Sequence, residues 1–236
     1  MFKRVKNNKK GFTLAEVLVT LGIIGVVSAM TVPTLMQNYQ RKSYVTQLHK
    51  VYNELSQAAL QYITDKNAVD LKEAGLIVTN NNTTAFENFI KNYFKVVQDC
   101  KDSPTPCFAP SYKKISGITI NPLCTKNCMV ISSGASLGFA QSFNNVIEIT
   151  VDVNGQNGPN VFGRDFFVIF LYPNGIIDDL AVKDIDDSES HSWSTNIAPL
   201  STDVREANFN RSCIENSSEA HGCFGKILND NWEMNY

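Results

Sequence analysis

The chain of 236 residues is poor in histidine and tryptophan, with three and two copies, and it has a single long uncharged stretch. Three scattered histidines are too few for most metal-hydrolase schemes, which need clustered imidazole ligands. One apolar stretch excludes a multi-span membrane protein, and 43% hydrophobic with 19% charged residues excludes a disordered chain. The composition therefore predicts one sizeable globular domain with an appendage.

Acidic residues are absent from residues 1–11, which carry five lysines and arginines. Because the whole chain holds 21 basic and 23 acidic residues, residues 12–236 hold 16 basic and 23 acidic ones, a net charge of −7. An acidic body repels the phosphate backbone of nucleic acids. We therefore expect no nucleic-acid partner.

The uncharged stretch covers the twenty residues 17–36. At about 1.5 Å per residue, a helix of this length spans about 30 Å, the thickness of the hydrocarbon core of a bilayer. The basic leader outweighs the cations at Arg41, Lys42 and Lys50 on the other side of the stretch. The positive-inside bias therefore predicts a single-pass helix with a cytoplasmic leader and with everything after about residue 40 outside the cytoplasm.

Two other interpretations of this stretch stay open. Residues 27–29 are small enough for the cleavage site of a secretory signal peptide, and the stretch would also serve as a plain anchor. Against a signal peptide, Glu16 lies at the start of the apolar run, and the helical pattern continues along residues 37–64. Apolar residues recur there at steps of three and four, at Val45, Leu48, Tyr52, Leu55, Ala59 and Tyr62. This stripe predicts an amphipathic continuation of the same helix.

Residues 10–24, which include Gly11, Phe12 and Glu16, resemble the amino-terminal signature of type IV pilins and of the pseudopilins of type II secretion. The resemblance is close through about residue 42 and includes Pro33, which many such proteins have. It implies that a prepilin peptidase cuts after Gly11 on the cytoplasmic face and methylates the new amino terminus at Phe12. It also implies contacts with other pilin or pseudopilin subunits through their amino-terminal helices, and with an inner-membrane assembly platform.

Glu16 has a physical role in such an assembly. Cleavage after Gly11 leaves the Phe12 amine and the Glu16 carboxylate as the ions at the head of the apolar helix. A carboxylate in lipid is costly for an isolated subunit, and the Phe12 amine of a neighbouring subunit would neutralise it. The attraction is strong at low dielectric and would fix the axial register. We therefore assign assembly to Phe12, Glu16 and Pro33, and we expect Pro33 to kink or locally melt the helix near residues 30–33.

The whole pattern predicts an α+β, pilin-like fold, in which a long N-terminal membrane-spanning helix continues into an ectodomain with an antiparallel β-sheet lying on it. A capping-box pattern at Thr84–Glu87 predicts a second helix from Phe86 to Val97. Strand signals follow at residues 115–120, 128–132, 146–153, 165–172 and 175–182, with a hairpin turn at Tyr172–Gly175. The expected domains are a cleaved leader (1–11), a membrane and assembly helix (12–36), its amphipathic continuation (37–64) and an α+β domain (65–236).

Six cysteines follow the apolar stretch, namely Cys100, Cys107, Cys124, Cys128, Cys213 and Cys223. An even number outside the membrane favours disulfides, and the sequence-adjacent pairs, each closing a short loop, are the most economical of many pairings. A zinc site is the rival interpretation. Cys124 and Cys128 have no second Cys-x-x-Cys or histidine pair to complete such a site, so we favour disulfides.

The loop of residues 152–165 carries side-chain oxygens on Asp152, Asn154, Gln156 and Asp165. Calcium takes about six to eight hard oxygen ligands of this kind, so the loop is a candidate calcium site, although it does not follow the EF-hand spacing. The alternative is an Asn/Gly turn between two strands.

Together these patterns predict a structural subunit, a minor pilin or a pseudopilin, which is the substrate of an enzyme rather than an enzyme. Before assembly it would lie in the bacterial inner membrane with its ectodomain in the periplasm, and after assembly it would belong to a type IV pilus or a type II secretion pseudopilus. The alternative is a membrane-anchored extracellular ligand-binding or adhesin domain, for which the helix is only a tether. The sequence does not separate minor pilin from pseudopilin.

Overall fold

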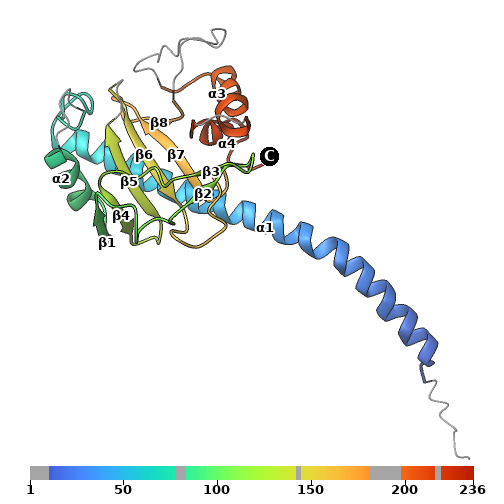
Figure 1. The fold of residues 1–236 in the computed structure, drawn as a ribbon. Coiled ribbons are helices and arrows are strands. Elements are labelled where there is room, and N and C mark those ends of the chain that lie inside the picture. The colour runs from blue at the N-terminus through green and yellow to red at the C-terminus, as the bar shows by residue number, and fades with distance from the viewer. Residues whose placement is uncertain (1–10, 78–82, 142–144, 181–197, 216–218) are drawn as a thin grey trace, which may run out of the picture. The chain divides into compact units, whose positions relative to one another are not determined.

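The computed structural model describes residues 11–77, 83–141, 145–180, 198–215 and 219–236 (Figure 1). Contacts divide the chain after Arg41 into two compact units, and helix α1, Leu14–Asp65, contributes to both. The predictions about the basic leader, apart from Gly11, fall outside the described residues.

In the first unit, every side chain of α1 from residue 14 to residue 40 is exposed. Within the described part of the chain, α1 is the one helix long and apolar enough to cross a membrane. The helix continues through Pro33 without a break, so the expected local melting is not found. The hydroxyls of Thr31 and Thr34 donate to the carbonyls of Val27 and Met30, at 2.9 and 3.4 Å, and so add hydrogen bonds on either side of the Ala29 carbonyl, to which Pro33 has no N–H to donate.

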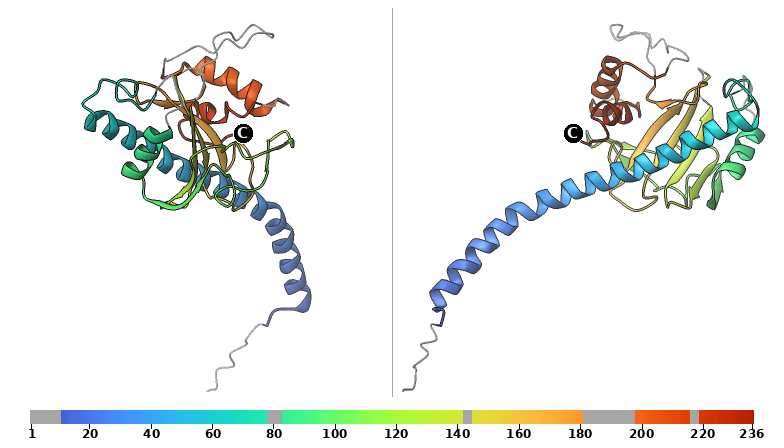
Figure 2. Two further views of the ribbon diagram at one scale, coloured as in Figure 1. Left: turned by 60° about the vertical axis from the view of Figure 1, so that its left-hand side comes forward. Right: turned by 180° about the vertical axis from the view of Figure 1, so that it is seen from behind.

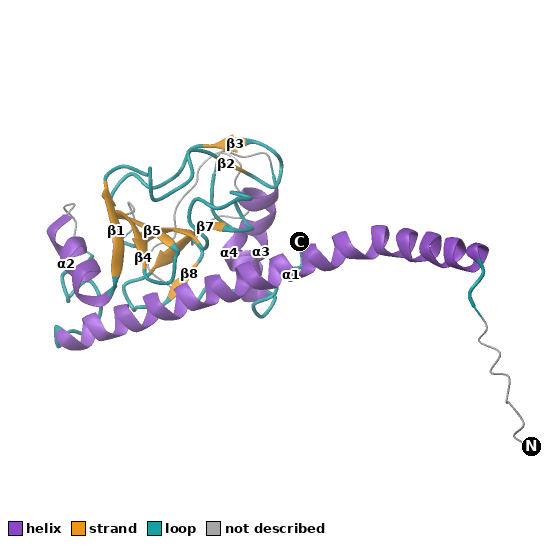
Figure 3. Cartoon of the chain, turned by 90° about the horizontal axis from the view of Figure 1, so that it is seen from below, coloured by secondary structure: helices purple, strands orange, loops and turns teal. Residues whose placement is uncertain are grey.

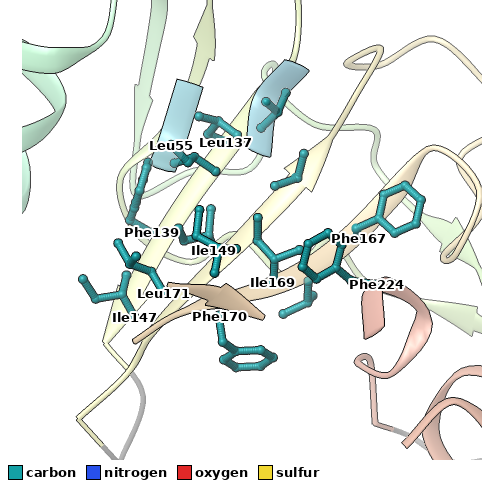
Figure 4. Packing of buried hydrophobic residues seen from close by; sticks show 14 of the residues in the cluster. Leu55, Leu137, Phe139, Ile147, Ile149, Phe167, Ile169, Phe170, Leu171 and Phe224 are labelled. Carbon is teal, nitrogen blue, oxygen red and sulfur yellow. The ribbon is translucent and has the colours of Figure 1, made fainter. Parts of the chain in front are cut away.

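In the second unit, one face of α1 is buried in the hydrophobic core. The buried side chains are Val45, Leu48, Val51, Leu55, Ala58, Ala59 and Tyr62. Tyr52, which the stripe also included, is partly buried. The right-hand view of Figure 2 shows this part of α1 crossing the sheet, and Figure 4 shows Leu55 among the inward side chains of the sheet. The three-and-four periodicity therefore identified the packed face of the helix.

The sheet has six antiparallel strands in the order β1-β4-β5-β6-β7-β8. Their bounds are β1 Val96–Lys101, β4 Cys128–Ile131, β5 Ser136–Gln141, β6 Ile147–Asp152, β7 Phe166–Leu171 and β8 Ile177–Asp178. A separate pair joins β2, Tyr112–Lys113, to β3, Thr119–Ile120. The register places Phe139 opposite Ile149 and Ile149 opposite Ile169, so a continuous apolar row crosses the central strands.

Several expected elements have different bounds in the structure. Helix α2 is Thr83–Tyr93, and Val96 and Val97 belong to β1 instead of to the end of that helix, because β1 pairs with β4, with Val96 opposite Ile131. Residues 115–120 form a strand only at Thr119–Ile120, and β5 was not expected at all. The hairpin turn after β7 is confirmed, with Gly175 at a φ of 80°, a conformation that glycine adopts without strain.

The two faces of the sheet are covered by different parts of the chain. Leu137 and Phe139 of β5 are buried in the core that α1 enters, so Gly138 between them points the other way. A Cβ on Gly138 would lie 2.4 Å from Cys124 Sγ, which shows how closely the loop before β4 covers that face. All six residues of β7 are buried, as expected for a strand covered on both faces.

Three short helices end the described chain: α3, Thr202–Asn208, the π-helix η1, Phe209–Ile214, and α4, Cys223–Asn229. The ring of Trp232, just beyond α4, stacks on His49 of α1 with ring centroids 4.0 Å apart. The structure therefore ties the C-terminal residues to the packed part of α1 (Figure 3).

Candidate functional site

The predicted processing site lies directly before α1. Gly11 and Phe12 have no helical or strand assignment, and the Phe12 side chain is 89% exposed. Thr13 is the N-cap of α1, because its carbonyl accepts the N–H of Val17 at 3.2 Å. An extended, exposed segment before a helix is the kind of backbone that a peptidase can reach.

Glu16 closes a capping box with Thr13. Its Oε2 accepts the Thr13 backbone N–H at 2.8 Å and the Thr13 hydroxyl at 2.9 Å, while the Glu16 N–H donates to the Thr13 hydroxyl oxygen at 3.3 Å. This reciprocal arrangement satisfies helix N–H groups that would otherwise lack partners. This cap was not predicted from the sequence, although the Thr-x-x-Glu spacing that signals it is present at residues 13–16.

The apolar surface of α1 begins immediately after this cap. A row of exposed apolar side chains follows the helix and ends near Tyr39. Leu18, Ile24 and Leu35 are examples, and each is about 60% exposed or more. A surface of this extent on one helix indicates a lipid or protein environment rather than water. Gly22 and Gly25 lie within it with open space around them, so a second helix could approach closely there.

Residues 6–32 match the model of the prokaryotic N-terminal methylation motif. This motif is the prepilin cleavage and methylation signature, typical of type IV pilins and pseudopilins. No curated protein and no solved structure matches the chain. The methylation motif covers Gly11, Phe12 and Glu16, and a six-stranded antiparallel sheet with a long apolar helix, a pilin-like layout, follows it.

Beyond the methylation motif, the loop between β6 and β7 brings Asp152 and Asp165 together in the protein interior. Asp152 accepts the Tyr112 hydroxyl at 2.6 Å, and Asp165 accepts the N–H groups of Asn160 and Val161 at 2.8 and 2.7 Å. Burial raises the pKa of both carboxyls, to about 8 for Asp152, where the charge of the nearby Asp165 adds to the rise.

The four residues of the calcium prediction do not all converge. Asn154 lies beside Asp152, whose Oδ1 accepts its N–H at 3.2 Å, but the Gln156 amide donates to the carbonyls of Pro106 and Phe108 instead. The Oδ1 atoms of Asn154 and Asn160 are buried and have no hydrogen-bond partner within the described residues. No three His, Cys, Asp or Glu residues of the described chain are grouped as a metal site, so calcium binding stays a prediction.

An Asp152→Asn substitution tests this loop. Because the pKa of Asp152 is higher in the folded chain than in the unfolded one, the contribution of Asp152 to stability is greatest below about pH 4 and falls as the pH rises to about 8. Without a cation, the neutral amide removes this cost, still accepts the Tyr112 hydroxyl, and should raise the melting temperature at pH 8 by about 4 °C or more. Thermal melts at pH 5 and pH 8 measure the effect.

The exposed variant Asp102→Asn is the control and should leave both melts unchanged. A calcium-loaded loop gives the opposite result, because the bound cation then offsets the free-energy cost of ionising the two buried carboxyls. In that case calcium would stabilise the original chain against a chelator, and Asp152→Asn would lower the melting temperature at pH 8.

The six cysteines form three disulfides, all between neighbours in the sequence: Cys100–Cys107, Cys124–Cys128 and Cys213–Cys223. The two cysteines of each pair are separated by 7, 4 and 10 positions in the sequence, so each disulfide closes a short loop. The first and second flank β1 and β4 at one edge of the sheet, and the third joins η1 to the start of α4. The first two disulfides therefore each link an irregular connecting segment to a strand, and the third links two helices.

A buried polar cluster beside the third disulfide was not anticipated. His221 lies between Asp179 and Glu219, with Nδ1 3.7 Å from Asp179 Oδ1 and Nε2 3.3 Å from Glu219 Oε2. Burial alone would lower the pKa of His221, but the two carboxylates raise it overall. The hydrogen bond from His221 helps to lower the pKa of Glu219 to about 2. Because Asp179 is far from Glu219 and His221 in the sequence, no local pattern could have predicted the cluster.

Proposed function

We propose that the chain is a prepilin-type structural subunit, a minor pilin or a pseudopilin, which is cut after Gly11, methylated at Phe12 and assembled through α1. The observation that carries this proposal is the methylation motif at residues 6–32, joined to a helix whose apolar side chains are exposed. Members of families with this motif are structural subunits that anchor in the membrane before assembly.

Membrane topology follows from charge. The leader carries five cations and no acid, so it stays in the cytoplasm, where the peptidase acts, and the unit from residue 42 onward lies outside. Three disulfides in that unit support an oxidising compartment such as the periplasm. The partners are other subunits of the same kind, the prepilin peptidase and an inner-membrane assembly platform.

The intact mass of the protein tests the processing step. Co-expression with a prepilin peptidase should give a chain that has lost residues 1–11 and gained one methyl group at the amine of Phe12. Expression without the peptidase is the matched control and should give the full-length mass. A full-length mass in both samples, or cleavage near Ala29, would contradict the proposal and support a plain anchor or a signal peptide.

A further inference from the structure

A hollow of about 420 Å³ lies between the last turns of α1, the segment that follows α1, and α2. Figures 1 and 3 show α2 beside this end of α1. We call it the α1–α2 hollow. Its described lining is Tyr62, Asp65, Lys66, Ala74, Gly75, Thr84, Ala85, Asn88, Asn92 and Tyr93. The volume lies within the range of sites for small ligands.

The α2 wall of the hollow presents unused hydrogen-bonding groups. Thr84, Asn88 and Asn92 are spaced four residues apart, so they form one stripe along the helix. All three are exposed, and none of these side chains makes a hydrogen bond within the described chain. Each amide offers two donors and an acceptor, so the stripe can both donate to and accept from a ligand.

Contacts between α1, the end of α2 and the segment after α1 hold the rest of the lining in place. The Tyr93 hydroxyl donates to Asp65 Oδ2 at 2.7 Å, and the Tyr62 hydroxyl donates to the Ala74 carbonyl at 3.2 Å. The two tyrosine rings meet edge to face with centroids 5.7 Å apart. Lys66 Nζ lies 5.7 Å from the Tyr62 ring, and Asp65 and Lys66, the two ionised side chains of the lining, carry opposite charges. This part of the lining is therefore ordered, presents aromatic edges and carries little net charge.

From this combination we infer that the α1–α2 hollow binds a neutral saccharide. Free amides and a hydroxyl match the donors and acceptors of sugar hydroxyl groups, and a half-buried aromatic ring offers an apolar edge to the C–H groups of a sugar ring. An anion or a cation would gain little, because the two ionised side chains of the lining have opposite signs.

The test uses the full chain in a phosphocholine detergent, since a maltoside detergent would itself compete for the site. Saturation-transfer difference NMR with N-acetylglucosamine, galactose and glucose should detect binding of at least one sugar. The double variant Asn88→Ala/Asn92→Ala should weaken that binding at least tenfold. Both positions are exposed within a helix, where alanine is the most favourable residue, so the variant should fold normally.

Asn53→Ala is the matched control, because Asn53 is an exposed asparagine of α1 that does not line the hollow. It should bind the sugar as the original chain does. Absence of any sugar signal at millimolar concentrations, or equal binding by the double variant, would overturn the inference. The result is independent of the assembly function, which requires Glu16 and not the α1–α2 hollow.

Discussion

Subunits with Glu16→Ala are expected to be processed and to enter the membrane, but to be missing from the assembled filament. After cleavage, the Phe12 amine and the Glu16 carboxylate are the charges at the head of an exposed apolar helix. At low dielectric, the attraction between the amine of one subunit and the carboxylate of the next is strong and depends on distance. Alanine removes that attraction and leaves the Phe12 amine of the neighbouring subunit without a partner.

The structure adds a second role for Glu16 that the experiment must separate from the first. Its carboxylate caps α1 by accepting the Thr13 backbone N–H at 2.8 Å. Glutamine can fill the same capping position, because its side-chain oxygen accepts the same N–H group. Glu16→Gln therefore keeps the cap and removes the charge. If charge pairing drives assembly, both variants should be absent from the filament; if capping suffices, Glu16→Gln should assemble.

The measurement compares the sheared filament fraction with the membrane fraction by immunoblot, with the unsubstituted subunit in parallel. Both variants should be present in the membrane at normal levels. Normal filament content of Glu16→Gln would contradict the charge-pairing account. Normal content of Glu16→Ala as well would show that assembly needs neither the charge nor the cap. Absence of the unsubstituted subunit from the filament would favour the tether interpretation, in which the helix only anchors a ligand-binding domain.

Features with a local signal were predictable from the sequence. The apolar run of α1 and the stripe from Val45 to Tyr62 follow from helical periodicity, and the turn at Tyr172–Gly175 follows from its Pro-Asn-Gly residues. The methylation motif is likewise local, because it depends on residues 6–32 alone. Each of these features is determined by residues within a few helical turns of one another.

Features that depend on distant partners were not predictable. Residues 96–97 continue an apolar helical pattern after Tyr93, but pairing with β4 makes them a strand. Strand β5 contains Ser136 and Gly138, which are weak strand formers, and its place in the sheet comes from pairing on both sides. The candidate calcium loop shows the same limit, since the direction of the Gln156 side chain is set by Pro106 and Phe108.

The largest loss of stability is expected for Arg205→Ala. The Arg205 guanidinium donates to both carboxylate oxygens of Asp178, at 2.9 and 2.6 Å, and so joins α3 to β8. The Asp178 side chain is fully buried and the Arg205 side chain is 16% exposed. Removing one partner of a buried pair leaves an uncompensated charge, which costs about 3–5 kcal/mol of unfolding free energy. Thermal melts should therefore show a decrease of about 6–20 °C.

Two further variants show whether the buried charge causes this loss. Lys50→Ala breaks an exposed pair with Glu54, 4.0 Å apart, and should cost less than about 0.5 kcal/mol. Adding Asp178→Asn to Arg205→Ala removes the unpaired charge, while the amide oxygen can still accept the Leu200 N–H that Asp178 accepts at 2.8 Å. The double variant should therefore recover part of the loss. If it is less stable than Arg205→Ala alone, the contribution of Arg205 is packing of its side chain between α3 and β8 rather than charge compensation.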